Sequence, residues 1–407
     1  MKKTILSLIA VMAFAMNTLA ASFETNREWY LAGETMKVSI TADGAEVAYA
    51  ELCDTHGIKA GVAVRIDGGR GTGKVELPSE LHSGYYVLSV YTRHNSNVAN
   101  KLVAVVNPLH KNADDNIKWV EIASPDSSSY PQTGYFSAAD LVSKKVVDVR
   151  ETEGHIIKAR VKNVVDGQTF KGSQIFPTLS IIGMQVNYFE GKMVNDSLAV
   201  FYTYGIYGKQ PLVLSARTST GVSLPIEVIS PFATLIPKKL PRLVFHYKRS
   251  EVEARSIEMQ KRHPMAATPI VPLEYDDNVH GTKPDLTYNL DEYRQFLTIR
   301  EVLIEYVSCV SKRKTNGVSR LVVRFDVDPS HSFLPSLVLI DGMPVFDTER
   351  LLSYDARRIH YINIYGGHYT FGNNIYNGLL SFVTRSGRLT NYPTEHNMQY
   401  LEYDFPE

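Results

Sequence analysis

Residues 68–92 read GGRGTGKVELPSELHSGYYVLSVYT, and this stretch decides whether the chain is built around a nucleotide site or around β-strands. Its first seven residues, which end in Gly73 and Lys74, fit the G-x-x-x-x-G-K frame of a phosphate-binding loop. Such a loop also needs Ser or Thr after the lysine to hold magnesium, and a helix whose N-terminal amides face the phosphates. Here Val75 follows the lysine, and VELPSELHSGYY predicts a strand. We therefore expect a turn between strands, with no nucleotide and no other cofactor.

Short runs with strand character surround this stretch, and each is bounded by Gly, Asp, Asn or Pro. In the first quarter of the chain they cover 27–40, 47–54, 62–67, 84–92 and 101–107. Several short strands at this spacing are typical of a β-sandwich. The composition, with 24 Tyr, also favours β-structure. We predict a mainly β fold, with one β-sandwich over 22–110 and a second over 111–232, where similar runs recur.

The rest of the chain changes character twice. Residues 233–288 contain many prolines and a basic cluster, and predict an extended linker with a short helix at 251–261. Residues 289–390 predict a small α+β domain, because Thr298-Ile-Arg-Glu301 forms a capping box and strand-like runs follow. A tail is expected over 391–407. Structural turns are assigned to Gly33, Gly73, Gly84, Asn316, Gly317, Asp341, Gly342 and Gly378.

The N-terminus predicts export. Lys2 and Lys3 precede a short apolar run, and small residues follow at Ala20 and Ala21. This pattern is typical of a signal peptide over 1–21 with cleavage at Ala20 or Ala21. No further apolar segment long enough for a membrane helix follows. We expect a periplasmic or surface protein that associates with membranes only through a partner.

Charge and reactive residues indicate no catalytic site. The 43 acidic and 43 basic residues balance, so no global field would recruit nucleic acid. Cys53 and Cys309 cannot form a disulfide scaffold, and free thiols are the expected state. Two acidic groups contain residue types that bind metals, Asp276-Asp277 with His280 and Asp326 with Asp328, but their places on a loop and at a strand end indicate solvated polar residues. We expect neither a metal nor an enzymatic activity.

Two stretches resemble known families. Gly33-Glu34-Thr35, Leu77-Pro78, Gly84-Tyr85-Tyr86 and Tyr91-Thr92, with Gly73 and Leu81, resemble the macroglobulin-type (MG2-like) β-sandwich of Bacteroidetes cell-envelope proteins. Asp341-Gly342-Met343-Pro344, Ile359 to Ile364 and Gly378 to Thr384 resemble the plug domain of TonB-dependent outer-membrane receptors. Such a receptor needs a barrel of many strands, and only 20 residues follow Gly387. A thioester-type macroglobulin needs Cys-Gly-Glu-Gln, and neither cysteine lies in that motif.

These resemblances imply a non-catalytic exported binding protein of the cell envelope. The first expectation is an accessory of outer-membrane transport or assembly, whose plug-like domain over 289–390 docks an envelope protein such as an outer-membrane β-barrel. The alternative is a surface adhesion protein whose sandwiches bind a host protein or a glycan. A hydrolase is the third and weakest hypothesis, because no G-x-S-x-G elbow is present.

Overall fold

In a computed structural model of the chain, the described residues are 21–93, 98–109, 114–123, 131, 133–142, 151, 154–183, 187–218, 220–262, 283–315, 318–324, 334–371, 374–389, 392 and 395–407. The chain divides into two compact units. Unit 1 comprises Met1–Thr152 and Ala233–Gln260, and unit 2 comprises Glu153–Phe232 and Lys261–Glu407. The two units therefore alternate along the chain, and each contains two separate segments.

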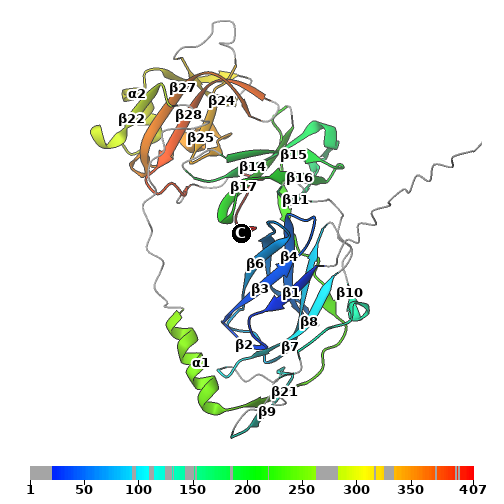
Figure 1. The fold of residues 1–407 in the computed structure, drawn as a ribbon. Helices are drawn as coiled ribbons and strands as arrows, with labels where there is room; N and C mark the ends of the chain where they lie inside the picture. The colour runs from blue at the N-terminus through cyan, green and yellow to red at the C-terminus, as the bar shows by residue number, and fades with distance from the viewer. Residues whose placement is uncertain are drawn as a thin grey trace, which may run out of the picture. The chain divides into compact units, whose positions relative to one another are not determined.

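Unit 1 is built on a β-sandwich of a three-stranded and a five-stranded sheet (Figure 1). The smaller sheet has the order β1-β3-β6 and the larger one the order β2-β8-β7-β4-β5. The strands are β1 (Ser22–Thr25), β2 (Trp29–Leu31), β3 (Thr35–Thr41), β4 (Val47–Asp54), β5 (Gly57–Arg65), β6 (Arg70–Glu76), β7 (Gly84–Thr92) and β8 (Ala99–Val106).

The hydrophobic core of unit 1 lies between these sheets. Along β3, Met36, Val38 and Ile40 are buried while the residues between them are exposed. This alternation is expected of a strand that has one face in solvent. All nine residues of β7 are buried, so both of its faces are covered. Leu88 and Val90 belong to the core between the sheets, and other parts of the chain cover the opposite face.

The segment predicted as a linker over 233–288 provides part of that cover, and the prediction is corrected for its first half. The elements of this segment are β20 (Ile236–Pro237), β21 (Leu243–Tyr247) and α1 (Arg249–Arg262). They are accompanied by three elements from earlier in the chain, β9 (Ile117–Glu121), η1 (Ala138–Asp140) and β10 (Leu141–Val142). β21 pairs in parallel with β9, and Leu243 and Phe245 are buried against Trp29 and Leu31. Residues 263–282 lie outside the described part of the chain.

Arg255 is the main polar link between helix α1 and the sandwich of unit 1, beside the apolar packing of Val252. The Arg255 guanidinium donates to both carboxylate oxygens of Glu34, at 2.8 and 2.7 Å, and to the carbonyl of Trp29 at 2.8 Å. It also lies over the Trp29 ring, 3.8 Å from the centroid. The predicted helix at 251–261 is therefore present, but as a packed element rather than as part of a solvated linker.

The first part of unit 2 is a second β-sandwich, made from one eight-stranded sheet. Its strands run in the order β18-β17-β14-β15-β16-β11-β19, and β29 pairs with β17. Strands from both ends of this order contribute to one core, for example Ile157 of β11 and Leu214 of β17. The elements are β11 (His155–Val161), β12 (Val164–Val165), β13 (Gln168–Thr169), η2 (Gly172–Gln174), β14 (Ile175–Ile181), β15 (Asn187–Met193), β16 (Leu198–Thr203), β17 (Gly208–Thr218), β18 (Ser223–Leu224), β19 (Ile226–Ile229) and β29 (Gln399–Phe405).

The C-terminal segment predicted as a tail over 391–407 supplies one of these strands. β29 pairs antiparallel with β17 from Leu214↔Gln399 to Gly208↔Phe405. Tyr403 and Phe405 enter the sandwich core, and the Tyr403 hydroxyl lies 2.7 Å from Nε2 of buried His155. The end of the chain is thus part of the second sandwich, and the prediction of a separate tail is wrong for residues 399–405.

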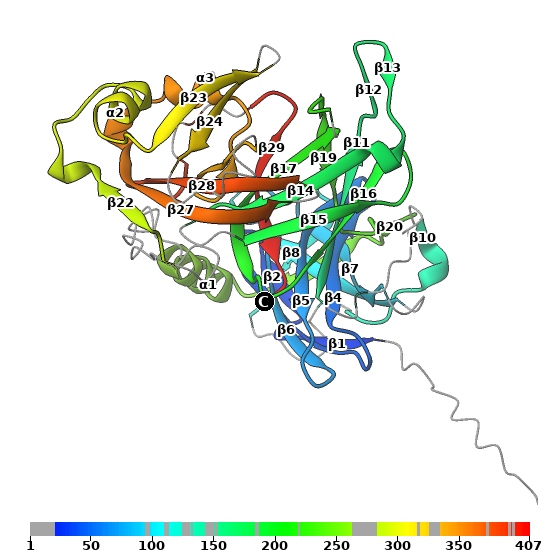
Figure 2. The ribbon, with the colours of Figure 1, turned by 90° about the horizontal axis from the view of Figure 1, so that it is seen from above.

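The second part of unit 2 is an α+β arrangement around a five-stranded sheet of order β22-β27-β28-β25-β26 (Figure 2). The helices α2 and α3 and the hairpin β23-β24 accompany it. The elements are β22 (Leu286–Asn289), η3 (Leu290–Glu292), α2 (Ile299–Glu305), β23 (Val310–Thr315), β24 (Val318–Val323), β25 (Leu337–Ile340), β26 (Met343–Pro344), α3 (Thr348–Leu352), η5 (Ala356–Arg358), β27 (Ile359–Phe371) and β28 (Asn374–Thr384).

The molecule is therefore mainly β, with two β-sandwiches, as the sequence predicts. The capping box is also confirmed: the Thr298 hydroxyl accepts from the N–H of Glu301, and the Glu301 carboxylate accepts from the N–H of Thr298. Among the described residues, no helix has the length and the apolar content that crossing a bilayer requires.

Candidate interaction surface

Three of the residues assigned to turns lie in turns. Gly33 follows β2 with φ of 88°, and the backbone there leaves one sheet of unit 1 for the other. Asp341 and Gly342 connect β25 to β26 with φ of 46° and 80°. The buried Asp341 carboxylate accepts hydrogen bonds from Thr384 (N–H and hydroxyl) and from the N–H of Leu389. This Asp-Gly pair therefore fixes the loop after β28 as well as its own turn.

Three other assignments need correction. Gly73 lies within β6 and Gly84 begins β7, and neither has a positive φ. Gly378 has a positive φ of 77° but lies within β28, opposite a register shift of β27. Asn316, Gly317 and Ala20 lie outside the described residues, and Ala21 is the first residue described.

The stretch that resembles a phosphate loop forms a strand connection. Gly68 and Gly69, both with positive φ, make the turn between β5 and β6, closed by the pair Asp67 and Arg70. Lys74 is exposed on β6 and pairs with Lys37. The residues after Gly73 thus continue a strand where a nucleotide-binding loop would begin a helix.

No group of three or more metal-ligating side chains gathers within the described ranges. The two acidic groups weighed in the sequence, 276–280 and 326–328, fall outside them.

A buried carboxylate holds the start of the later unit 1 segment. Glu51 of β4 is fully buried, and one of its oxygens accepts from the Tyr91 hydroxyl at 3.0 Å and the Thr234 N–H at 3.1 Å. The other oxygen accepts from the N–H of Leu235. The Tyr91 hydroxyl in turn accepts from the N–H of Ala233 at 2.6 Å. Burial raises the pKa of Glu51, and these donors oppose that shift.

A second buried carboxylate holds the end of the first segment. Glu151 accepts from Arg93 at 2.7 Å and from the Tyr49 hydroxyl, 2.7 Å from both carboxylate oxygens. The Arg93 and Glu151 side chains are 3% and 2% exposed. Breaking a buried pair of this kind costs about 3–5 kcal/mol. The segment 153–232 of unit 2 lies between the two segments of unit 1. Side chains of the larger sheet of unit 1 and of Arg93 therefore hold the chain on both sides of it, at residue 151 and at residues 233–235.

This polar cluster is suited to structure rather than to chemistry. Its thiol, Cys53, is buried, and burial together with the charge of Glu51 raises the pKa of Cys53 well above its usual range. A thiol in that state is not a nucleophile at neutral pH. The groups around Glu51 and Glu151 form hydrogen bonds with one another, so the cluster holds the two segments of unit 1 on its larger sheet.

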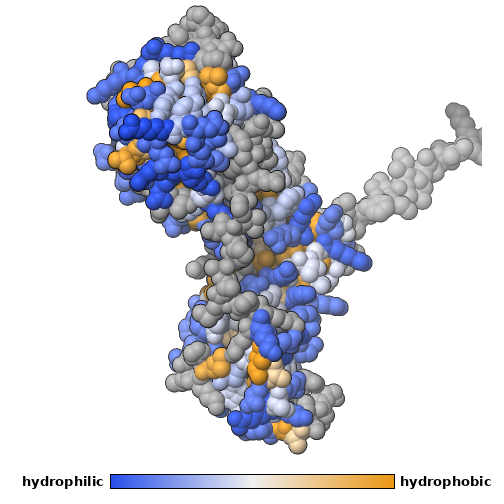
Figure 3. Space-filling view, turned by 90° about the vertical axis from the view of Figure 1, so that its left-hand side faces the viewer, coloured by the Kyte–Doolittle hydropathy of each residue, from blue (hydrophilic) through white to orange (hydrophobic). Residues whose placement is uncertain are grey.

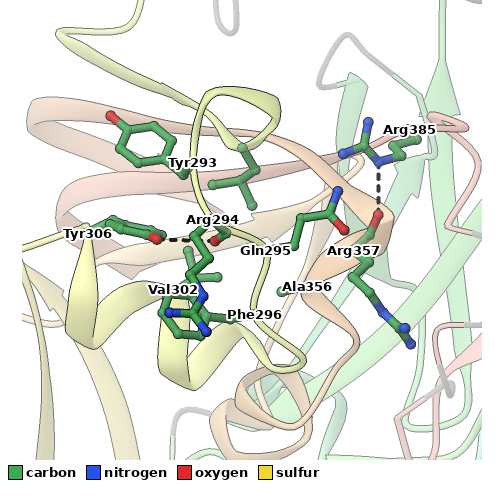
Figure 4. Close-up of a pocket in the computed structure, with 10 residues that line it drawn as sticks. Tyr293, Arg294, Gln295, Phe296, Val302, Tyr306, Ala356, Arg357 and Arg385 are labelled. Atoms are coloured by element: carbon green, nitrogen blue, oxygen red, sulfur yellow. Dashed lines mark hydrogen bonds between the residues drawn. The ribbon is translucent and has the colours of Figure 1, made fainter.

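The aromatic side chains that precede and follow α2 form a different kind of site, which lies at the surface. The Tyr293 and Tyr306 rings lie 4.6 Å apart, and the Phe296 ring lies 5.4 Å from Tyr306 (Figure 4). The Tyr306 hydroxyl donates to the carbonyl of Arg294 at 3.1 Å, which fixes the loop before the helix. The pocket beneath them has a volume of about 10 Å³, room for about one water molecule. It is therefore not a small-molecule site.

Two aliphatic side chains close to these rings in the sequence are exposed although their backbone is ordered. Leu297 is 63% exposed and Ile304 of α2 is 72% exposed. The N–H of Leu297 donates to Glu301 and its carbonyl accepts from Ala356 at 3.1 Å, so hydrogen bonds hold Leu297 in this position. We call Tyr293, Phe296, Leu297, Ile304 and Tyr306 the α2 surface.

Charged groups border the α2 surface. Asp291 bonds to Arg385 at 2.5 Å and to His360 at 3.1 Å, and the hydrogen bond from Arg385 is the main cause that lowers the pKa of Asp291. Figure 3, which views the side that holds α2 and β22, shows apolar residues in small groups among hydrophilic ones on this part of unit 2. An apolar centre with a polar rim is the usual anatomy of a protein–protein interface.

A second exposed aromatic group lies on the sandwich of unit 2. Tyr202 of β16, Tyr204 and Tyr207 are 51%, 72% and 47% exposed. The Tyr204 ring contacts Phe189 edge-on at 5.5 Å between centroids. From the sequence, these tyrosines contribute only to the composition that favours β-structure, although the YTYGIYG run between two strands marks an aromatic loop.

The comparisons with known proteins assign no family. No family model matches the chain, and no curated protein matches it. Among solved structures, the chain is similar to the BSP domain of a biofilm associated protein, at 13% identity and a TM-score of 0.18, over 55% of this chain and 30% of that one.

It is also similar to native E. coli alpha-2-macroglobulin, at 10% identity and a TM-score of 0.20, over 52% of this chain and 14% of that one. A third structure, DIP-gamma IG1+IG2, shares 10% identity at a TM-score of 0.15, over 56% of this chain and 99% of that one. The chain thus spans less than a third of the length of the first two. Bacterial alpha-2-macroglobulin and Ig-like proteins are among its neighbours, and likenesses this weak identify neither a family nor a function.

Proposed function

We propose that the chain is a non-catalytic exported binding protein of the cell envelope, and that it docks a partner protein through the α2 surface. The supporting observation is that Leu297 and Ile304, which are close in sequence to three packed aromatic rings, are exposed, and that hydrogen bonds hold the backbone of Leu297. Rigid aromatic and apolar side chains at the centre of a patch carry most of the binding energy in protein interfaces. The part of the chain that carries the α2 surface is the part whose sequence resembles a plug domain.

The proposed setting is the outer membrane of a Bacteroidetes-type envelope, with the chain as an accessory of transport or assembly. It rests on the resemblances to macroglobulin-type and plug domains and on the signal-like N-terminus. In this proposal a free-standing plug-like domain docks to an envelope protein, an outer-membrane β-barrel, and the sandwiches act as its scaffold.

The test is a photo-crosslinking residue placed at position 297 in the full chain, expressed in its native host. We expect a crosslink to an outer-membrane β-barrel protein that co-purifies in detergent. The double variant Leu297→Glu, Ile304→Glu should abolish this co-purification. Ile375→Glu, which alters another exposed apolar residue of unit 2 (57% exposed), should leave it unchanged. A monodisperse protein that yields no crosslink to an envelope protein would count against the proposal.

The second candidate is surface adhesion, and the exposed tyrosines of the second sandwich favour it. Tyr202, Tyr204 and Tyr207 offer rings of the kind that binding surfaces use at low conformational-entropy cost. Protease treatment of intact cells discriminates between the candidates, because an adhesin is cleaved whereas a periplasmic accessory is protected. Loss of binding to host cells or glycans in Tyr204→Ala, with docking through α2 intact, would favour adhesion.

A further inference from the structure

A second cavity in unit 2, separate from the α2 surface, lies where the sandwich and the α+β part of this unit meet. Its volume is about 280 Å³, close to the lower end of the range for small-ligand pockets. The sandwich contributes Arg217 of β17 and Ser223 of β18, and the α+β part contributes Phe346 and the residues of α3. Glu395 and His396, just before β29, complete the wall.

Arg217 is the distinctive group in this cavity. Its guanidinium carbon lies 3.9 Å from the centroid of the Phe346 ring, and Nη2 donates to the carbonyl of Gly221 at 3.0 Å. An arginine has five N–H donors. Among the described residues, the Arg217 side chain makes no other hydrogen bond and no ion pair. Burial lowers the pKa of Arg217, because the cation is partly removed from water, and the nearby charge of Glu395 opposes this shift.

The acidic groups nearby are engaged elsewhere. One oxygen of Glu395, which is 7% exposed, accepts from the N–H groups of Phe346 and Asp347, at 2.9 Å each. Glu349 bonds to Lys312 and Arg300, and hydrogen bonds from Lys312, Ser319 and Arg300 lower its pKa to about 2. Arg217 is therefore a cation with unused donors and without a bonded counter-charge, at the wall of a cavity.

We propose that this cavity binds a carboxylate group, with Arg217 as its main partner. The planar guanidinium matches a carboxylate through two parallel hydrogen bonds. A single negative charge fits better than a doubly charged phosphate, because Glu395 and Asp347 line the same cavity. The carboxylate belongs to a small organic acid or to a peptide. This site does not depend on the docking proposed for the α2 surface.

The test is calorimetric titration of the purified full chain with four probes. These are butyrate, N-acetyl-dialanine with a free C-terminus, the same dipeptide as its C-terminal amide, and inorganic phosphate. We expect saturable binding of one or both carboxylic acids, no binding of the amide and weaker binding of phosphate. Binding of butyrate alone would identify a small acid as the source, and binding of the free dipeptide alone would identify a peptide.

Three variants locate the binding at Arg217. Arg217→Gln should weaken binding of the acid about tenfold or more. Arg217→Lys keeps the charge but loses the paired N–H donors of the guanidinium, and it should weaken binding less. Arg160→Gln, which alters an exposed arginine of the same sheet, should bind as the wild type does. If Arg217→Gln does not fold, Glu395→Gln provides the second test, because removal of a neighbouring negative charge should tighten binding.

Four results would overturn the proposal: no saturable binding of either acid, equal binding of the amide, unchanged affinity in a folded Arg217→Gln, or tighter binding of inorganic phosphate than of the acids.

Discussion

Gly73 is one of the positions in the phosphate-loop-like stretch where an added methyl group should harm the fold. A Cβ at this position would lie 2.4 Å from Cγ2 of Val64 and 3.1 Å from Cγ1 of Val62. Carbon atoms in van der Waals contact lie about 3.5–4.0 Å apart. Val64 is fully buried and cannot swing away. Gly73→Ala therefore forces β6 and β5 apart within the core of unit 1.

We expect this variant to destabilise unit 1 by about 1–3 kcal/mol, the usual cost of overpacking a core. For a folding unit of this size, that corresponds to a fall in Tm of roughly 2–12 °C. Both tryptophans of the chain, Trp29 and Trp119, lie in unit 1. Tryptophan fluorescence in a urea titration therefore follows this unit selectively, and its midpoint should fall without a change in slope.

The same stretch contains two matched controls. Gly84→Ala should leave the midpoint unchanged or slightly raised, because its Cβ would meet Asn116 no closer than 3.6 Å and its φ is not positive. Lys74→Ala removes an exposed side chain of β6 and should change stability by less than about 0.5 kcal/mol. The reasoning would be refuted if the urea midpoint of Gly73→Ala equalled that of the wild type, or if Gly84→Ala lowered the midpoint by the same amount as Gly73→Ala.

Two further predictions concern the buried carboxylates. Glu51→Gln should destabilise unit 1 by about 1–3 kcal/mol near pH 5. The NH₂ group of the glutamine would face a backbone N–H from which the Glu51 carboxylate accepts a hydrogen bond. Since burial raises the pKa of Glu51, the folded state binds this proton more tightly than the unfolded chain. The stability that Glu51 contributes therefore decreases as pH rises above about 4.5, and the difference between wild type and Glu51→Gln should narrow between pH 4.5 and 8 in tryptophan-monitored urea titrations. A difference that stays constant with pH would contradict this. Asp341→Asn should lower the calorimetric midpoint of unit 2 and speed hydrogen exchange over 384–389, because its amide would face donors from Thr384 and Leu389; unchanged protection there would argue against this role of Asp341.

Elements with a strong local pattern could be predicted from the sequence. The alternation along β3 and the Thr298–Glu301 capping box both involve residues within one turn or one strand. The hairpin β23-β24 is a similar case, since its strands pair from Val310↔Val323 to Thr315↔Val318, directly across the predicted Asn-Gly turn. In each case the free energy that selects the conformation comes from near neighbours in the chain.

The partners of distant segments could not be predicted. Residues 233–260 contain prolines and basic residues, so their composition indicates a linker. Leu243 and Phe245 are nevertheless buried, because β21 pairs with β9 far earlier in the chain. β29 is a comparable case, since its short alternating run gains stability only from the edge of β17. Local propensity carries no information about such partners.

The candidate sites differ in the same way. Tyr293, Phe296 and Tyr306 are close in sequence, so an aromatic cluster around a short helix could have been proposed from the sequence. Arg217 and Glu395 are far apart, and neither lies in a motif that suggests binding. What distinguishes Arg217 is the set of hydrogen bonds that it does not make among the described residues, and this becomes visible only when every neighbour is placed.

The alternation of the two units along the chain bears on how unit 1 can be isolated. The hydrophobic cluster around Trp29 draws Leu243, Phe245 and Val252 from the later segment. A fragment over the predicted domain 22–110 would leave this cluster open and would lack both buried polar contacts, Glu151 with Arg93 and Ala233 with Tyr91. The smallest version of unit 1 is therefore a chain in which a flexible linker joins residue 151 directly to residue 233. Because both contacts are made within unit 1 itself, such a chain keeps them, and its tryptophan signal should then match that of the full chain.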